Sequence, residues 1–243
     1  MARKKPNSAA TTLREIEETG DRLATWAAEH AVVILGAITA ILVIAAGAGL
    51  YVQHSSDVRD EAANALALAM SQYRTAMGAD PLGGPIVEPA NPELGVQTRT
   101  KYVERFIAVA REHAGTTAGS VAWLEAGNLQ AELGEVDAAV ESFEAARDSG
   151  GDRAIAALAS VRLANLAEEQ GDLAAAAEAY EQAAAVDGYP LAADALLAAA
   201  RCRAQAGESE QALALYQRFE TEHPDVSAPP YVASLMAELR LGR

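Results

Sequence analysis

The stretch "GDLAAAAEAYEQAA" at residues 171–184 contains a spacing that recurs on both sides of it. A glycine is followed five residues later by an alanine and nine residues later by an aromatic residue. The same spacing occurs in "GEVDAAVESFEAA" at residues 134–146 and in "GESEQALALYQRF" at residues 207–219. The matching positions are Gly134, Gly171 and Gly207, then Ala139, Ala176 and Ala212, then Phe143, Tyr180 and Tyr216. The glycines lie 37 and 36 residues apart, so the chain contains a repeat of that length.

Each repeat predicts a pair of helices joined at its glycine. The first helices are expected at residues 120–133, 157–170 and 193–206, and each second helix begins just after the glycine. Such a turn needs a left-handed residue, which glycine adopts without strain. The recurring alanine lets the two helices lie close together, and the aromatic residue fills the space between neighbouring repeats. Pro224 ends the last of these helices.

Composition favours an all-α fold. Of the 243 residues, 51% are hydrophobic but only 5% are aromatic, because much of the apolar content is alanine, a strong helix former. The formal charge is −15, and residues 1–30 are neutral overall, so the negative excess lies later in the chain. An acidic domain repels phosphate backbones, which disfavours nucleic acid as a partner.

Residues 31–52, "AVVILGAITAILVIAAGAGLYV", contain no charged residue and are long enough to cross a bilayer as one helix. A cleaved signal peptide usually has a shorter apolar core that follows a short basic start. We therefore expect a signal anchor that is retained. Five Lys and Arg residues precede the run, whereas Arg59 is the only one within about 20 residues after it, a bias that places residues 1–30 in the cytoplasm.

The other segments follow from local patterns. Residues 1–30 form an amphipathic cytoplasmic stub, which either rests at the lipid surface or docks a partner. Residues 53–77 continue the helix beyond the span, and residues 78–98 form a loop rich in proline and glycine. Residues 99–243 form the helical repeat domain. Within it, Tyr102–Ala114 is expected to belong to a degenerate capping unit, and the segment from residue 229 onward is expected to form a closing helix.

Helix pairs of this kind resemble the tetratricopeptide repeat. In the first repeat the resemblance rests on Trp123, Gly127, Gly134, Ala139, Phe143 and Ala146. The second repeat lacks the tryptophan, and the third has Phe219 where a small residue is expected. The resemblance implies a superhelix in which the first helix of each pair lines a concave groove.

Six positions on the first helices are candidates for lining that groove: Leu124, Asn128, Val161, Asn165, Leu197 and Arg201. Asn128 and Asn165 are equivalent in adjacent repeats, and their amides can hydrogen-bond the backbone of an extended peptide. The alternative is that they are solvated helix residues. Tetratricopeptide domains that clamp a terminal carboxylate have lysines beside such asparagines, and the apolar neighbours here disfavour a charged clamp. Tyr73, Trp123 and Tyr189 are either ligand anchors or core residues.

Nothing in the sequence indicates catalysis, a cofactor or a small-molecule substrate. The four histidines are scattered and have no Cys, Asp or Glu at ligand spacing, which argues against a metal site. Cys202, the one cysteine, lies among alanines on a predicted helix and is expected to be a buried, inert thiol. The acidic pair Glu168–Glu169 is interpreted as a solvated helix face.

The complete layout is similar to that of the YfgM-like family of bacterial inner-membrane proteins, which are ancillary subunits of the SecYEG translocon. Members have a cytoplasmic stub, one span and a periplasmic tetratricopeptide domain, with a "YGxLAxLxLA"-like helix where this chain has "TAGSVAWLEAGNLQAELG". The resemblance implies a periplasmic module that meets secretory chains together with periplasmic chaperones. The long loop after Met77 departs from the family pattern.

Two further functions stay open. One is an envelope scaffold or assembly factor of an inner-membrane or cell-division complex, with the groove holding another protein's tail. The other is an accessory subunit of an enzyme, bound through the span and the cytoplasmic stub. In every case the chain is expected to act through protein–protein interaction and not as an enzyme.

Overall fold

The computed structural model describes residues 26, 30–80, 85–86 and 88–241, and all the secondary structure in these residues is helical. The chain divides into two units, residues 1–57 and residues 58–243. The helices are α2 Ala31–Ala76, α3 Pro92–Glu112, α4 Thr117–Glu132, α5 Val136–Asp148, α6 Arg153–Glu169, α7 Leu173–Ala184, α8 Ala192–Gln205, α9 Ser209–Glu222 and α10 Pro230–Arg240.

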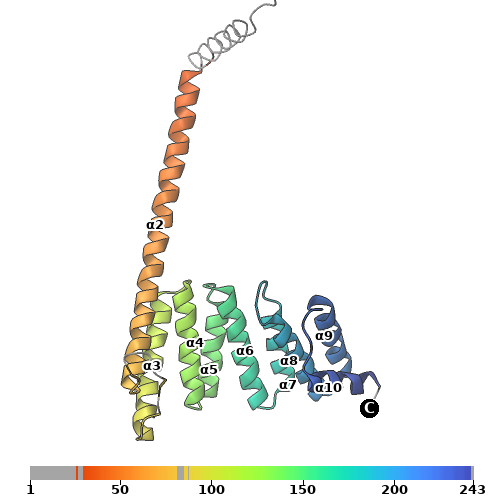
Figure 1. Cartoon of the computed structure of the whole chain (residues 1–243). Helices are drawn as coiled ribbons and strands as arrows, with labels where there is room; N and C mark the ends of the chain where they lie inside the picture. The colour runs from red at the N-terminus through yellow and green to blue at the C-terminus, as the bar shows by residue number, and fades with distance from the viewer. Residues whose placement is uncertain (1–25, 27–29, 81–84, 87, 242–243) are drawn as a thin grey trace, which may run out of the picture. The chain divides into compact units, whose positions relative to one another are not determined.

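Three helix pairs form the repeats, namely α4 with α5, α6 with α7, and α8 with α9. Consecutive helices pack against each other along the series from α3 to α10, and α4 also contacts α6. Figure 1 shows these helices side by side, with α10 beside α8 and α9 at the C-terminal end. Residues 58–243 therefore form a single layered array, as the repeat predicts.

The turn within each pair has the same hydrogen-bonding pattern. In the second repeat, Gly171 has φ of +79°. Its N–H donates to the carbonyl of Glu168 at 2.9 Å, and the N–H of Asp172 donates to that of Ala167 at 2.9 Å. The equivalent turns after α4 and α8 repeat both bonds. This arrangement satisfies the last carbonyls of the first helix and requires the left-handed residue, which explains the recurring glycine.

Small residues and aromatic residues occupy the predicted positions in the core. The recurring alanines at 139, 176 and 212 have no exposed surface, and the aromatic residues at 143, 180 and 216 are buried. In the first repeat, the ring of Phe143 lies directly over Gly127, so that a Cβ atom added there would be 2.6 Å from two ring carbons. Glycine at this position is therefore required by the close approach of α4 and α5.

The repeat domain begins earlier than predicted. The end of α2 packs on α3, with Ala69 fully buried and the rings of Tyr73 and Tyr102 5.4 Å apart. Residues from 58 onward thus belong to the same unit as the repeats, whereas the sequence placed the boundary at residue 99. The end of α2 and α3 form the expected degenerate capping pair.

The loop predicted at residues 78–98 is shorter in the structure, because its last seven residues belong to helix α3. Helix α3 begins at Pro92, in its first turn, where a proline costs no hydrogen bond because the N–H has no helical partner there. The side chain of Asn91 caps the helix by accepting from the N–H of Glu93 at 3.1 Å. The fourth proline of the segment is thus a helix start and not part of the loop.

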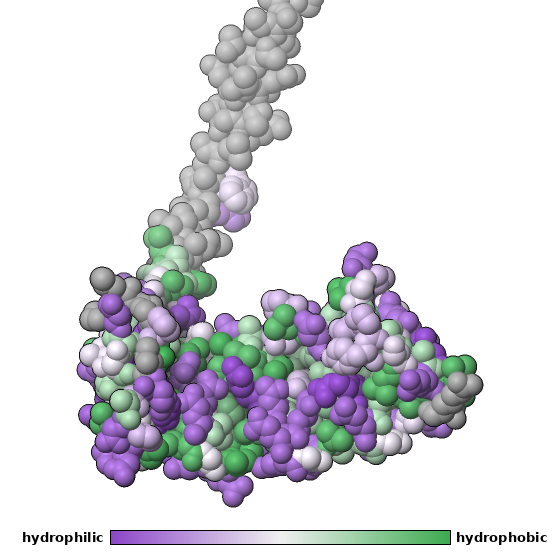
Figure 2. Space-filling view, turned by 60° about the horizontal axis from the view of Figure 1, so that its bottom comes forward, coloured by the Kyte–Doolittle hydropathy of each residue, from purple (hydrophilic) through white to green (hydrophobic). Residues whose placement is uncertain are grey.

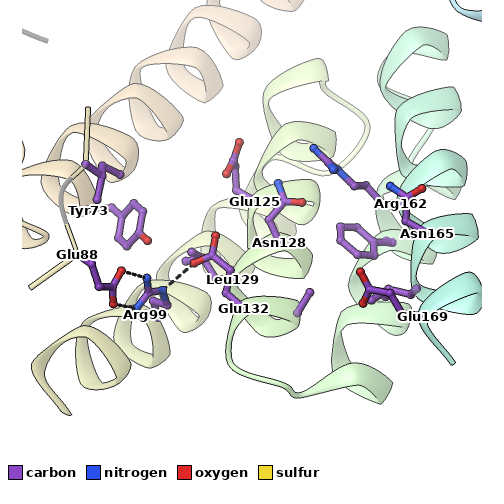
Figure 3. Close-up of a pocket in the computed structure, with 14 residues that line it drawn as sticks. Tyr73, Glu88, Arg99, Glu125, Asn128, Leu129, Glu132, Arg162, Asn165 and Glu169 are labelled. Carbon is purple, nitrogen blue, oxygen red and sulfur yellow. Dashed lines mark hydrogen bonds and ion pairs between the residues drawn. The ribbon is translucent and has the colours of Figure 1, made fainter. Parts of the chain in front are cut away.

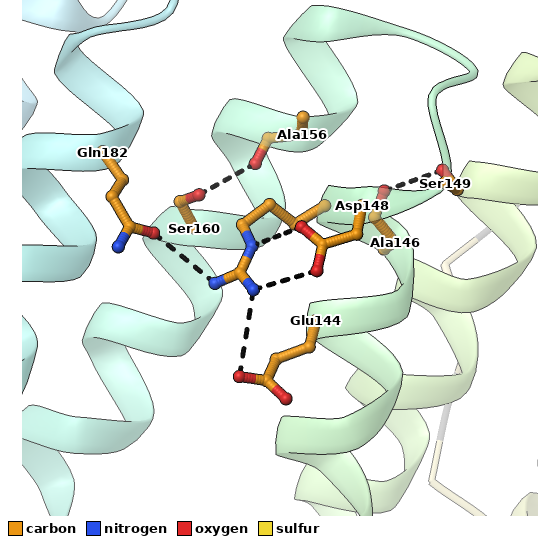
Figure 4. A network of polar contacts seen from close by, with 8 residues as sticks. Glu144, Ala146, Asp148, Ser149, Ala156, Ser160 and Gln182 are labelled. Atoms are coloured by element: carbon orange, nitrogen blue, oxygen red, sulfur yellow. Dashed lines mark hydrogen bonds and ion pairs between the residues drawn. The ribbon is translucent and has the colours of Figure 1, made fainter.

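A polar network connects α5 with α7 on the second helices (Figure 4). The guanidinium of Arg147 donates two bonds to the carboxylate of Asp148, at 2.8 and 3.1 Å, and one to the side-chain oxygen of Gln182 at 3.4 Å. Glu144 lies 3.9 Å from the same guanidinium. This side of the repeats carries its own charge pairs, and apart from the ring of Phe143 it does not line the groove between α4 and α6.

The predicted span and stub are not established by the structure. Over the described residues, no helix combines the length and the apolar character that crossing a membrane requires. The side chains of residues 31–35 and 37–41, which form the first half of the predicted span, lie outside the described residues, as does almost all of the stub at residues 1–30. Both assignments stay predictions.

We expect Gly127→Ala to destabilise the protein by about 1–3 kcal/mol, because the added methyl group overpacks a buried contact. The measurement is the free energy of unfolding of the full chain in detergent, followed by circular dichroism in urea. The double variant Gly127→Ala/Phe143→Leu is the control, since the smaller side chain leaves room for the methyl group. Additive effects of the two substitutions would contradict the contact.

Candidate peptide-binding groove

A groove of about 870 Å³ lies between the first helices α4 and α6. The end of α2, the start of α3 and residues 86 and 88 of the preceding loop complete its wall at one side. Figure 3 shows the lining residues, in which polar and charged side chains predominate. They are Tyr73, Ile86, Glu88, Arg99, Glu125, Asn128, Leu129, Ala131, Glu132, Phe143, Arg162, Asn165, Leu166 and Glu169.

The two helices contribute equivalent rows. On α4 the polar lining residues are Glu125, Asn128 and Glu132, and on α6 the residues one repeat later line the groove as well. Offsets of three and four residues keep side chains on one face of a helix. The groove is thus built from a single helical face, presented twice by adjacent repeats.

The central row consists of two amides. The side-chain oxygen of Asn165 accepts from the hydroxyl of Tyr180 at 2.6 Å, which leaves the NH2 group of that amide to donate into the groove. Asn128 lies three residues after Glu125 on the same face of α4. Burial raises the pKa of Glu125, and the amide of Asn128 and the guanidinium of Arg162 oppose the shift.

An arginine holds the groove's wall beside α2. Arg99 donates two bonds to Glu88, at 2.9 and 2.6 Å, and one to Glu132 at 2.7 Å. Hydrogen bonding to Arg99 lowers the pKa of Glu88, and the same contact raises the pKa of the guanidinium. Tyr73 lies beside this cluster, and burial raises the pKa of its hydroxyl. Arg99 thus fixes the loop carboxylate and α4 to the start of α3.

The apolar candidates from the sequence do not line the groove. Leu124 and Leu197 are buried in the core with 5% of their surface exposed, and Val161 is partly buried against the core of the following repeat. One residue along a helix rotates a side chain by about 100°. The equivalent positions 124, 161 and 197 therefore point into the packing between repeats, and on α4 and α6 the next residue, Glu125 or Arg162, lines the groove.

Arg201 is also placed elsewhere. It donates two bonds to Glu168, at 2.9 and 2.7 Å, and both side chains are only about one-fifth exposed. This pair joins α6 to α8 and lowers the pKa of Glu168, contrary to the interpretation of Glu168 as a solvated residue. Cys202 beside it is fully buried, and burial raises the pKa of the thiol to about 12.

Of the six candidates, the groove brings together Asn128 and Asn165. Sequence reasoning missed the charged rows, although Glu125 and Arg162, and likewise Glu132 and Glu169, share the repeat offset of the two asparagines. Helical spacing from each asparagine would have found them. Helical spacing does not identify Glu88 and Arg99, because these residues come from segments outside the repeats. Among the described residues no group of His, Cys, Asp and Glu is arranged to hold a metal ion.

We expect Glu168→Gln to lower the free energy of unfolding by about 1–2 kcal/mol at neutral pH, because it removes a charge-assisted pair between two repeats. Since the folded-state pKa of Glu168 is lowered, this stabilisation is present above its ordinary value of 4.5 and is lost as pH falls through the folded-state pKa. The measurement is urea unfolding as a function of pH. Glu169→Gln is the matched control, and an equal effect in both variants would contradict the pairing.

Comparison with known proteins agrees with this architecture. Residues 24–194 match the family model described as "Tetratricopeptide repeat-like domain", and residues 194–225 match that described as "Tetratricopeptide repeat". Neither the curated proteins nor the solved structures contain a significant match. The first match covers more than half of the chain, from before α2 to the start of α8. The protein therefore belongs to the tetratricopeptide repeat-like domain family.

Proposed function

We propose that this protein is a membrane-anchored adaptor whose groove between α4 and α6 binds an extended segment of a partner protein. The observation that carries the proposal is the pair of asparagine amides, placed at equivalent positions of adjacent repeats inside one groove. Tetratricopeptide repeats mediate protein–protein interaction, and a polar groove of this kind suits a polypeptide backbone better than an apolar ligand.

The spacing of the amides fits an extended chain. Packed helices lie about 8–10 Å apart, and an extended chain rises about 3.3 Å per residue, so the two amides are matched to backbone groups about three residues apart. Asn165 offers a donor for a backbone carbonyl. The amide of Asn128 offers both a donor and an acceptor to the backbone of the bound segment.

The proposed location is the bacterial inner membrane, with the repeat domain in the periplasm. Support comes from the uncharged run at residues 31–52 and from the excess of Lys and Arg on its N-terminal side. Within that setting we favour an ancillary subunit of the Sec translocon, which assists secretory proteins together with periplasmic chaperones. The likeness in layout to the YfgM-like family supports this role.

An envelope scaffold is the second candidate. Four carboxylates and two guanidinium groups line the groove, a composition suited to one defined partner segment. A component that receives secretory chains of all sequences needs less discrimination. The identity of the captured partner distinguishes the two functions.

Photocrosslinking in cells tests the groove. With a photoreactive amino acid at Asn128 or at Asn165 in the full chain, we expect adducts that are absent when it replaces Glu141, an exposed residue of α5 outside the groove. Translocon subunits, chaperones or secretory chains among the adducts would support the secretion role. A single envelope complex in their place would support the scaffold, and identical adducts from all three positions would overturn a groove-specific partner.

Topology mapping tests the anchor. Alkaline phosphatase is active only in the periplasm, so a fusion after Arg243 is expected to be active, and a fusion after residue 30 is expected to be inactive. The fraction of the C-terminal fusion that resists alkaline extraction of membranes measures anchoring, and the fusion after residue 30, which lacks the proposed span, is the unanchored control. An inactive C-terminal fusion that accumulates intact would contradict the periplasmic location.

A further inference from the structure

We infer that the groove selects an extended segment that carries a lysine or arginine, whose side chain lies beside Glu132 and Glu169. The inference rests on the proposed function, because it names the chemical class of the segment that the same groove binds. It depends on how the charges in the groove are already paired within the protein.

The charges in the groove do not balance. Glu88, Glu125, Glu132 and Glu169 line it, against Arg99 and Arg162. Arg99 is engaged by Glu88 and Glu132 together, so one guanidinium faces two carboxylates. Arg162 lies near Glu125 and acts on it electrostatically. Two negative charges therefore remain uncompensated among the lining residues.

Glu169 is the carboxylate without a counterpart. It is exposed at the end of α6, and among the described residues no ion pair or hydrogen bond involves its carboxylate. Its neighbour Glu168 is held by Arg201 outside the groove. Glu132, the equivalent of Glu169 on α4, shares Arg99 with Glu88. The row formed by Glu132 and Glu169 is thus the most negative part of the lining.

The row is within reach of a peptide bound at the asparagines. Asn165 and Glu169 are four residues apart on α6, about 6 Å along the helix axis. Figure 3 shows Asn165 and Glu169 on the same helix, with Asn128 and Glu132 on the helix opposite. A lysine or arginine side chain that leaves a backbone bound at Asn128 and Asn165 covers this distance, and its aliphatic part passes over Leu129 and Leu166.

The surroundings strengthen the preference for a basic segment. The protein carries a formal charge of −15, so the field of the whole chain adds to the negative excess of the groove and attracts basic segments. Figure 2 shows hydrophilic and hydrophobic side chains interspersed over one face of the described part of the repeat domain. An acidic segment is repelled by the same field, so the groove discriminates by charge.

The test compares two fluorescein-labelled peptides that differ only in having lysine or glutamate at the same positions of an unstructured sequence of serine, alanine and valine. Binding to the purified full chain in neutral detergent is measured by fluorescence anisotropy. We expect the lysine peptide to bind about tenfold more tightly than the glutamate peptide, with the advantage decreasing as salt is added.

Two charge reversals locate the effect. Glu169→Lys is expected to weaken binding of the lysine peptide about fivefold. Glu141→Lys makes the same change in net charge on α5, outside the groove, and is expected to leave that binding nearly unchanged. Equal binding of the two peptides, or equal effects of the two reversals, would overturn the inference.

A substitution of one groove asparagine distinguishes failure of this inference from failure of the proposed function. If Asn128→Ala weakens both peptides equally and the two peptides bind alike, the groove binds polypeptide without selecting charge, and only the inference fails. If neither peptide binds and photocrosslinking from the groove captures no partner, both fail. Circular dichroism of each variant confirms that its helical content is retained.

Discussion

The close contact between the two helices of each pair is the constraint on which the rest of the repeat domain depends. Alanine or glycine on one helix allows the other to approach, and an aromatic side chain covers the junction, as Phe143 covers Gly127. The left-handed glycine turn directs each second helix back along the first. Because each pair is closed in this way, one face of α4 and one face of α6 are left to line the groove.

The polar lining of the groove consists largely of equivalent residues from two adjacent repeats. A single helix presents one asparagine between two charged residues, and this alone does not distinguish a site from a solvated surface. Stacking a second copy beside it places Asn165 next to Asn128 and produces a row of amides at a spacing that suits an extended backbone. The packing between repeats therefore sets the spacing of the two amides, and the Glu168–Arg201 pair between α6 and α8 contributes to that packing.

Internal pairing shapes what the groove can bind. Arg99 is held by two carboxylates and is only slightly exposed, so it contributes little free positive charge to a ligand. The same pairing joins the loop before α3 to α4 and closes one side of the groove. Within the part of the chain that the structure describes, Glu169 has no paired cation, so the groove is acidic even though both signs of charge line it.

The repeat, the all-helical fold, the glycine turns and the buried alanine and aromatic positions follow from the sequence alone, because they depend on spacing within one helix pair. The sequence also identified Asn128 and Asn165, since equivalent positions in adjacent repeats must lie side by side. Tertiary structure decided which neighbours face the groove, because a rotation of about 100° per residue separates the buried Leu124 from the groove-lining Glu125. Tertiary structure also decided that the end of α2 belongs to the array and that Glu88 and Arg99 complete the groove. Contacts between segments outside the repeats produce no repeating pattern in the sequence, so the sequence did not predict them.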